Sequence, residues 1–137
     1  MVTRSVVFLL VMVGALAPMS AGTRRQCVVG SDPRYSFDES RAVFLGTASR
    51  SRETGIICED CMDSYRTSFR VEKVWKGTIK RNTEVLSDAS FVAGKAYLIF
   101  AVGDPLQTYL DCGWSVAYDA ALEKRNFLAG RPSHKPK

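Results

Sequence analysis

Hydrophobic and polar positions alternate most clearly over Tyr65–Trp75. Phe69 and Val71 alternate with charged residues, and the alternation slips by one position near Lys73. A period of two predicts a strand with one buried and one solvated face. The slip indicates a β-bulge within that strand.

Four further segments combine β-branched or apolar residues with turn signals at their ends, which is typical of short strands. They are residues 42–49, 83–86, 96–102 and, as a strand or sheet edge, 106–112. The run 96–102 is continuously apolar, so we expect it to be buried on both faces. Five short strands in a small chain predict a mainly β fold, either a small barrel or a sandwich. A closed five-stranded β-barrel of this size would be of the OB type, which is the fold that we expect.

Helical patterns lie at both ends of these strands. Residues 37–40 predict a helical turn, and Asp119 is placed to cap a C-terminal helix over 120–128 that Gly130 would stop. Residues 131–137, with Arg131 and two lysines, predict a disordered basic tail.

The N-terminus has the three parts of a signal peptide. Arg4 precedes the apolar run Val6–Ala17, and small residues follow Pro18 up to Gly22. A transmembrane helix is the alternative, but the run is short for a bilayer and Pro18 interrupts it. We therefore expect a signal peptide over 1–22 and a secreted or periplasmic protein whose one domain spans 23–130, with no membrane span after cleavage.

The chain is 137 residues long with a formal net charge of +5, and its basic residues are spread along the sequence. An exported protein without a dense basic run is a poor fit for nucleic-acid binding. We therefore expect no nucleic-acid partner.

All four cysteines, Cys27, Cys58, Cys61 and Cys112, follow the predicted signal peptide. An even number of cysteines in an oxidising compartment predicts two disulfides, which could pair in three ways. The wide spacing of Cys27 and Cys112 and the close spacing of Cys58 and Cys61 favour these two pairs.

Three sequence segments and a late cysteine occur in an order that is characteristic of a known type of domain. Phe37–Gly46 reads FDESRAVFLG, Phe69–Gly77 reads FRVEKVWKG, and Gly94–Ala101 reads GKAYLIFA, with Cys112 following. This order resembles the netrin-like domain shared with the tissue inhibitors of metalloproteinases, especially its short single-domain bacterial members. The resemblance covers about Cys27 to Leu128.

The resemblance implies an OB-type barrel that binds a protein partner, with inhibition of an extracellular zinc metalloproteinase as the family's activity. In that family an N-terminal cysteine presents its α-amine and carbonyl to the open position of the protease zinc. The matching partner-binding residues here are Cys27, Val28 and Val29.

Two departures motivate an alternative function. Cys27 is not part of a Cys-x-Cys, and Thr23–Gln26 would precede it after cleavage. Residues 88–91 also lack the cysteine that family members usually carry there. The alternative is a non-inhibitory extracytoplasmic structural or docking domain.

Cys58-Glu-Asp-Cys61 could also form a redox pair or half of a zinc site. Its acidic neighbours disfavour a thiolate and no second Cys-x-x-Cys exists, so a structural disulfide is favoured. His134 is the only histidine, and no catalytic set of side chains can be assembled. We expect no enzyme activity, no metal and no cofactor.

Overall fold

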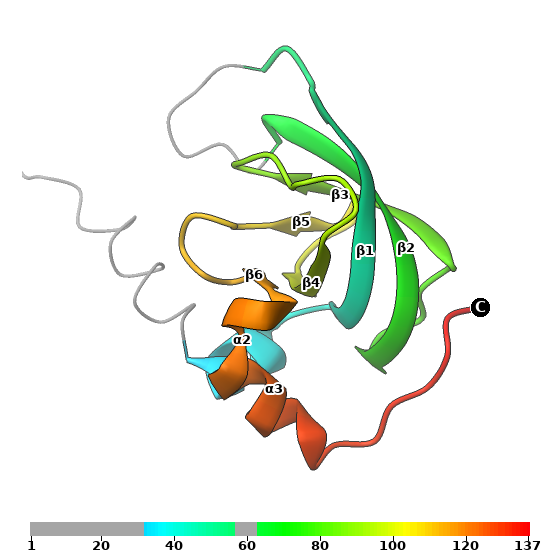
Figure 1. Cartoon of the computed structure of the whole chain (residues 1–137), viewed down its shortest axis with the longest axis vertical. Coiled ribbons are helices and arrows are strands. Elements are labelled where there is room, and N and C mark those ends of the chain that lie inside the picture. The colour runs from blue at the N-terminus through cyan, green and yellow to red at the C-terminus, as the bar shows by residue number, and fades with distance from the viewer. Residues whose placement is uncertain (1–31, 57–62) are drawn as a thin grey trace, which may run out of the picture.

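The computed structural model describes residues 32–56 and 63–137, which form one curled sheet with two helices packed at its side (Figure 1). The mainly β prediction is confirmed. The elements are α2 (Pro33–Glu39), β1 (Ala42–Glu53), β2 (Tyr65–Lys76), β3 (Asn82–Ser87), β4 (Ala96–Ala101), β5 (Gln107–Thr108), β6 (Val116–Ala117), the 3-10 helix η1 (Tyr118–Ala120) and α3 (Leu122–Ala129).

The sheet has six strands in the order β5-β3-β2-β1-β4-β6. Neighbours pair antiparallel except β3 and β5, which are parallel. Val102, just after β4, bridges Gln107 of β5 through two backbone hydrogen bonds of 2.8 Å. The sheet therefore curls far enough for its β5 edge to reach the end of β4.

The strand count differs from the five expected. The segment 106–112 contributes only the two residues of β5 and otherwise forms turns. The two-residue β6 has no periodic signal in the sequence, because it is too short to show one. β1 is longer than expected, since residues 50–53 continue its pairing with β2.

The predicted irregularity in β2 is confirmed. The β1–β2 register shifts at three places, two of which flank Lys73 on β2. Glu72 and Lys73 are both exposed, whereas Val71 and Val74 on either side are buried. Because bulges strengthen the right-handed twist, they help these two long strands to curl.

The concave side of the sheet encloses the first core layer. Phe69 of β2 lies at its centre, in edge-to-face ring contacts with Phe44, Phe91 and Tyr97 at 5.0 to 6.4 Å. β4 is buried from Tyr97 to Ala101, as its continuous apolar run predicted. Aromatic contacts of this kind add to the free energy of burial.

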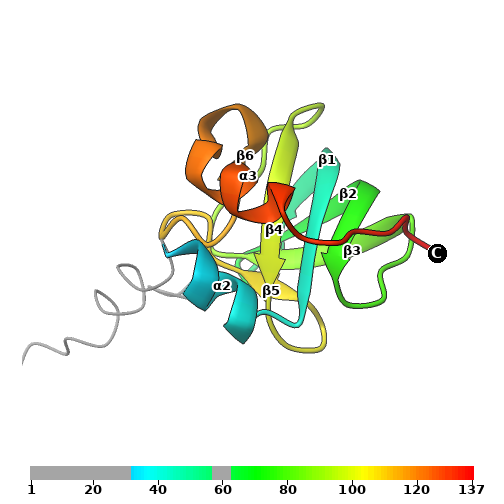
Figure 2. The same ribbon diagram turned by 90° about the horizontal axis from the view of Figure 1, so that it is seen from below.

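A second core layer lies between the convex side of the sheet and the helices, which lie next to each other near β4 (Figure 2). Leu98 and Phe100 of β4 enter this layer, together with Leu128 of α3. Trp75, expected in the core, is partly buried against the same cluster. β4 is therefore buried from both sides.

The two helices differ in how their N-termini are capped. Asp32 caps α2, its side chain accepting a hydrogen bond of 2.9 Å from the Arg34 amide, and Pro33 opens the helix. The prediction that Asp119 caps the C-terminal helix is wrong. Asp119 lies within η1, and Ala121 occupies the cap position of α3 without a side-chain bond.

The prediction of a disordered tail over 131–137 is also wrong. His134 pairs antiparallel with Val74 through backbone hydrogen bonds of 2.8 and 2.9 Å. Lys137 donates its amide to Ile79 and accepts from the Arg81 amide, both at 2.9 Å. The tail satisfies backbone groups that β3 does not reach, so it is ordered despite its polar side chains.

Within these described residues, no helix has the length and apolar character needed to cross a bilayer. The predicted signal peptide over 1–22 lies outside the described residues, so it stays a prediction.

Candidate functional site

Three connections gather at one end of the sheet, which we call the loop end. They are the described parts of the β1–β2 connection (residues 54–56 and 63–64), the β3–β4 loop over residues 88–95, and the turn over 109–115 (Figure 1). β1 and β3 finish at this end, whereas β2 and β4 begin there. The antiparallel pairing places these connections together although they are far apart in sequence.

The β3–β4 loop is held in one conformation by hydrogen bonds to the sheet. The Val92 amide donates to the Tyr97 hydroxyl at 2.9 Å, and the Gly94 amide donates to the Ala48 carbonyl at 2.7 Å. Phe91 inserts into the first core layer, 4 % exposed. A loop fixed in this way loses little conformational entropy when it binds a partner.

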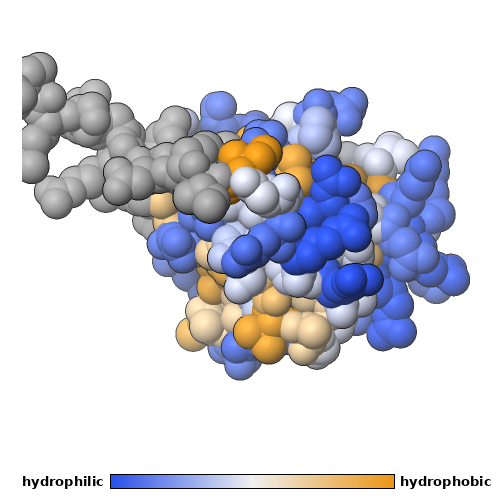
Figure 3. All heavy atoms as spheres, turned by 90° about the horizontal axis from the view of Figure 1, so that it is seen from above, coloured by the Kyte–Doolittle hydropathy of each residue, from blue (hydrophilic) through white to orange (hydrophobic). Residues whose placement is uncertain are grey.

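The loop end exposes hydrophobic side chains. Val92, next to the buried Phe91, is 62 % exposed, and Ile56 in the β1–β2 connection is 47 % exposed. Seen from this end, hydrophobic residues gather in small patches among hydrophilic ones (Figure 3). A rigid loop with an apolar tip is a feature of surfaces that bind proteins.

Asp88 fastens the 109–115 turn to the β3–β4 loop. Its carboxylate accepts hydrogen bonds from the Leu110 amide at 2.6 Å and from the Asp111 amide at 3.3 Å. Burial raises the pKa of Asp88, the hydrogen bond from Leu110 opposes that rise, and the charge of Asp111 adds to it. Asp88 lies in the stretch where the netrin-like resemblance would place a cysteine, and it supplies a noncovalent tie at that place.

Cys112 lies in the same turn and is not a free cysteine. Cys27, Cys58 and Cys61 lie outside the described residues, as do Val28 and Val29 of the predicted partner-binding segment. The Cys27–Cys112 and Cys58–Cys61 pairings and the role of that segment therefore stay predictions.

Lys124 of α3 is buried behind this turn, at 5 % exposure. Its Nζ donates to the Trp114 carbonyl at 3.2 Å and to Ser36 Oγ at 3.3 Å, and it lies 4.3 Å from the centre of the Phe100 ring. Burial lowers the pKa of Lys124 to about 8, partly opposed by the charges of Glu123 and Asp32. One side chain thus links α2, α3, the turn and the sheet.

In the part of the chain that the structure describes, no group of three or more His, Cys, Asp or Glu residues could hold a metal ion. The sequence patterns do not single out Asp88, Val92 or Lys124, because their roles come from contacts with segments elsewhere in the chain.

The comparisons with known proteins add no relative. No protein-family model matches the chain, and no curated protein shows significant similarity to it. The netrin-like resemblance therefore rests on the three sequence pieces quoted above.

Proposed function

We propose that this chain is an exported protein-binding module of netrin-like, OB-type architecture, and that its partner binds at the loop end. The preformed β3–β4 loop carries the proposal, because it holds an exposed Val92 on a buried, hydrogen-bonded base. The OB-type assignment is supported by the curl of the sheet and by the Val102–Gln107 bridge between β5 and the end of β4.

A zinc metalloproteinase is the partner that the resemblance favours. If Cys27 pairs with Cys112, residues 27–29 are tethered to the turn that Asp88 ties to the β3–β4 loop. Chain segments from two parts of the sequence would then form one continuous contact surface. The α-amine of Cys27 could reach a protease zinc only if Thr23–Gln26 had been removed.

The intact Thr23–Gln26 segment favours the second candidate, a docking domain that binds its partner without inhibiting it. The two candidates share the loop end and differ only in the N-terminal chemistry. N-terminal sequencing and disulfide mapping of the exported protein distinguish them: Cys27 as the first residue supports inhibition, and cleavage near Gly22 supports docking.

The binding experiment uses the folded protein, a panel of purified zinc proteases, and both an inhibition assay and direct binding. Val92→Asp should abolish binding because it places a charge at the apolar tip. Leu122→Asp is the matched control, since Leu122 is also 62 % exposed and lies on α3, outside the three connections that form the loop end. Proteases that stay active and unbound at large molar excess would contradict the inhibitor proposal.

A further inference from the structure

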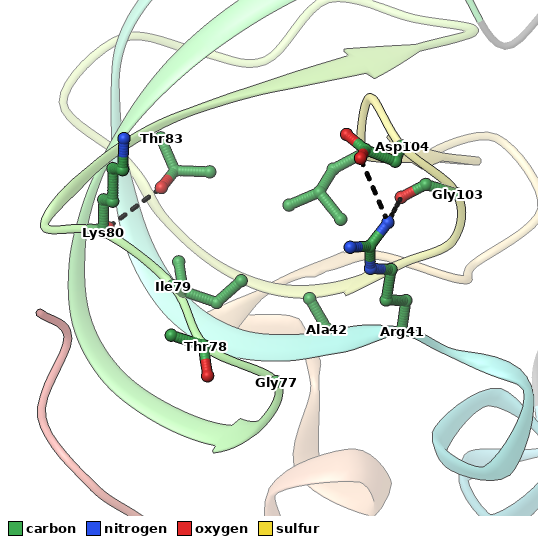
Figure 4. Close-up of a pocket in the computed structure, with 10 residues that line it drawn as sticks. Arg41, Ala42, Gly77, Thr78, Ile79, Lys80, Thr83, Gly103 and Asp104 are labelled. Carbon is green, nitrogen blue, oxygen red and sulfur yellow. Dashed lines mark hydrogen bonds and ion pairs between the residues drawn. The ribbon is translucent and has the colours of Figure 1, made fainter.

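A cavity of about 420 Å³ opens at the opposite end of the sheet from the loop end (Figure 4). Three connections line it: the start of β1, the β2–β3 turn and the β4–β5 turn. Its volume lies in the range of small-molecule sites, and the mouth of a curled sheet is a common place for them. None of its lining residues belongs to the loop end.

The walls of the cavity are held by main-chain contacts. Gly77 in the β2–β3 turn has φ +86°, and a Cβ there would lie 2.7 Å from the Arg41 carbonyl oxygen. On the other side of this turn, Lys137 of the tail bonds Ile79 and Arg81 through its backbone. The cavity is therefore formed before any ligand arrives, which lowers the cost of binding.

Two cations and one carboxylate lie at the rim of the cavity. Arg41 and Lys80 both line it, and the Arg41 guanidinium lies 3.5 Å from both the Asp104 carboxylate and the Gly103 carbonyl (Figure 4). The side chains of Arg41 and Asp104 are 60 % and 82 % exposed. A long, exposed ion pair contributes little free energy, so a ligand carboxylate can displace Asp104 from the guanidinium.

The rest of the lining is divided between hydroxyls and hydrocarbon. Thr78 and Thr83 supply hydroxyl groups, and Thr83 already donates its proton to the Lys80 carbonyl at 2.9 Å, which leaves its oxygen free to accept. Ile79 and Leu106 supply apolar surface. The cavity thus offers cations, hydroxyls and a hydrocarbon face within one small volume.

We propose that this cavity binds an acidic monosaccharide, a sugar carrying one carboxylate. The planar guanidinium of Arg41 matches a carboxylate through two parallel hydrogen bonds, and Lys80 adds a second positive charge. The threonine hydroxyls pair with sugar hydroxyls, and Ile79 and Leu106 contact the C–H face of the ring. This site shares no residue with the loop end, so the sugar-binding proposal and the proposed function are tested separately.

The test is a titration of the folded chain with galacturonate, galactose and acetate, followed by amide chemical shifts and by calorimetry. Galacturonate should bind with a Kd of about 1 mM and shift the amides of the β2–β3 turn. Galactose should bind at least about tenfold more weakly because it lacks the carboxylate, and acetate because it lacks the ring.

Arg41→Ala should weaken galacturonate binding by about tenfold or more, and Arg41→Lys by less, because lysine keeps the charge but not the paired donors. Lys95→Ala, which removes an exposed cation from the loop end, is the matched control and should bind like the parent. Thermal unfolding of each variant shows that it is folded. Equal binding of galacturonate and galactose, shifts confined to other parts of the chain, or unchanged affinity in folded Arg41→Ala would each overturn the proposal.

Discussion

The two ends of the sheet are held by different kinds of hydrogen bond. At the loop end, side chains add to the backbone bond between Gly94 and Ala48: Asp88 fastens one turn, and the Tyr97 hydroxyl fastens the β3–β4 loop. At the cavity end, the backbone of the C-terminal tail pairs with Val74, Ile79 and Arg81. The first arrangement depends on which side chains are present, and the second depends mainly on where the chain runs.

This difference predicts how each end responds to substitution. Single side-chain changes should disturb the loop end, because each tie there rests on one residue. Except at Gly77, the cavity end should tolerate such changes and should respond instead to removal of the tail.

Deletion of residues 131–137 should have the largest effect, lowering the free energy of unfolding by about 2–4 kcal/mol. It leaves four paired backbone groups without partners and removes Arg131, whose guanidinium lies 4.4 Å from the Phe37 and Phe127 rings. Chemical denaturation gives the free energy, and hydrogen exchange should show lost protection at Val74 and Arg81. A folded deletion variant with full protection there would show that the tail pairing is not stabilising.

Asp88→Ala should lower the free energy of unfolding by about 1–3 kcal/mol, because the Leu110 and Asp111 amides lose their acceptor. Asp88→Asn should cost less, since its amide oxygen keeps one acceptor and the burial of a charge is avoided. Asp111→Ala is the control, because Asp111 is exposed and its carboxylate accepts neither of these hydrogen bonds, although its charge opposes that of Asp88. Equal losses in Asp88→Ala and Asp111→Ala would argue against the tie.

Lys124 should give the chain a distinctive pH dependence. Its folded pKa of about 8 lies below the ordinary value of 10.5, so between these values the unfolded chain binds more protons. Stability should therefore rise as the pH increases from about 8 to 10.5, by about 1–2 kcal/mol from this group. Lys124→Met should remove that rise, which denaturation at a series of pH values would measure as a difference from the parent; identical slopes would contradict it.

Val92→Asp should change stability least, by less than about 0.5 kcal/mol, because the Val92 side chain is mostly exposed and its amide bond to Tyr97 remains. The same variant should nevertheless lose partner binding. A large drop in its melting temperature would mean that Val92 supports the fold, and the loop end would then be a less suitable contact surface.

Much of the sheet was predictable because its long strands carry a strong pattern. The alternation over Tyr65–Trp75 and the apolar run at 96–102 placed β2 and β4, and the slip at Lys73 placed an irregularity. The same reasoning failed for residues 131–137. An extended segment that is held by backbone hydrogen bonds and has exposed side chains leaves no hydrophobic pattern in the sequence.

The candidate site was less predictable than the fold. Lys124 lies in a polar helical segment and gives no sign of its burial, which depends on Phe100 and Trp114 from other elements. Val92 and Ile56 look like ordinary core residues, and only the path of the loops exposes them. Such roles arise from tertiary contacts between segments that are distant in sequence.

Gly77 has a consequence for how this chain could vary over time. Position 77 combines a positive φ with a backbone oxygen 2.7 Å from where a Cβ would lie, whereas Gly55, Gly94 and Gly113 share the positive φ and face open space. In a library that samples every amino acid, asparagine and aspartate should survive at those three positions, while only glycine should survive at position 77. Glycine would then be retained at position 77 because it lacks a Cβ, and the backbone at the cavity mouth would keep its shape. The side chains around the cavity could still change.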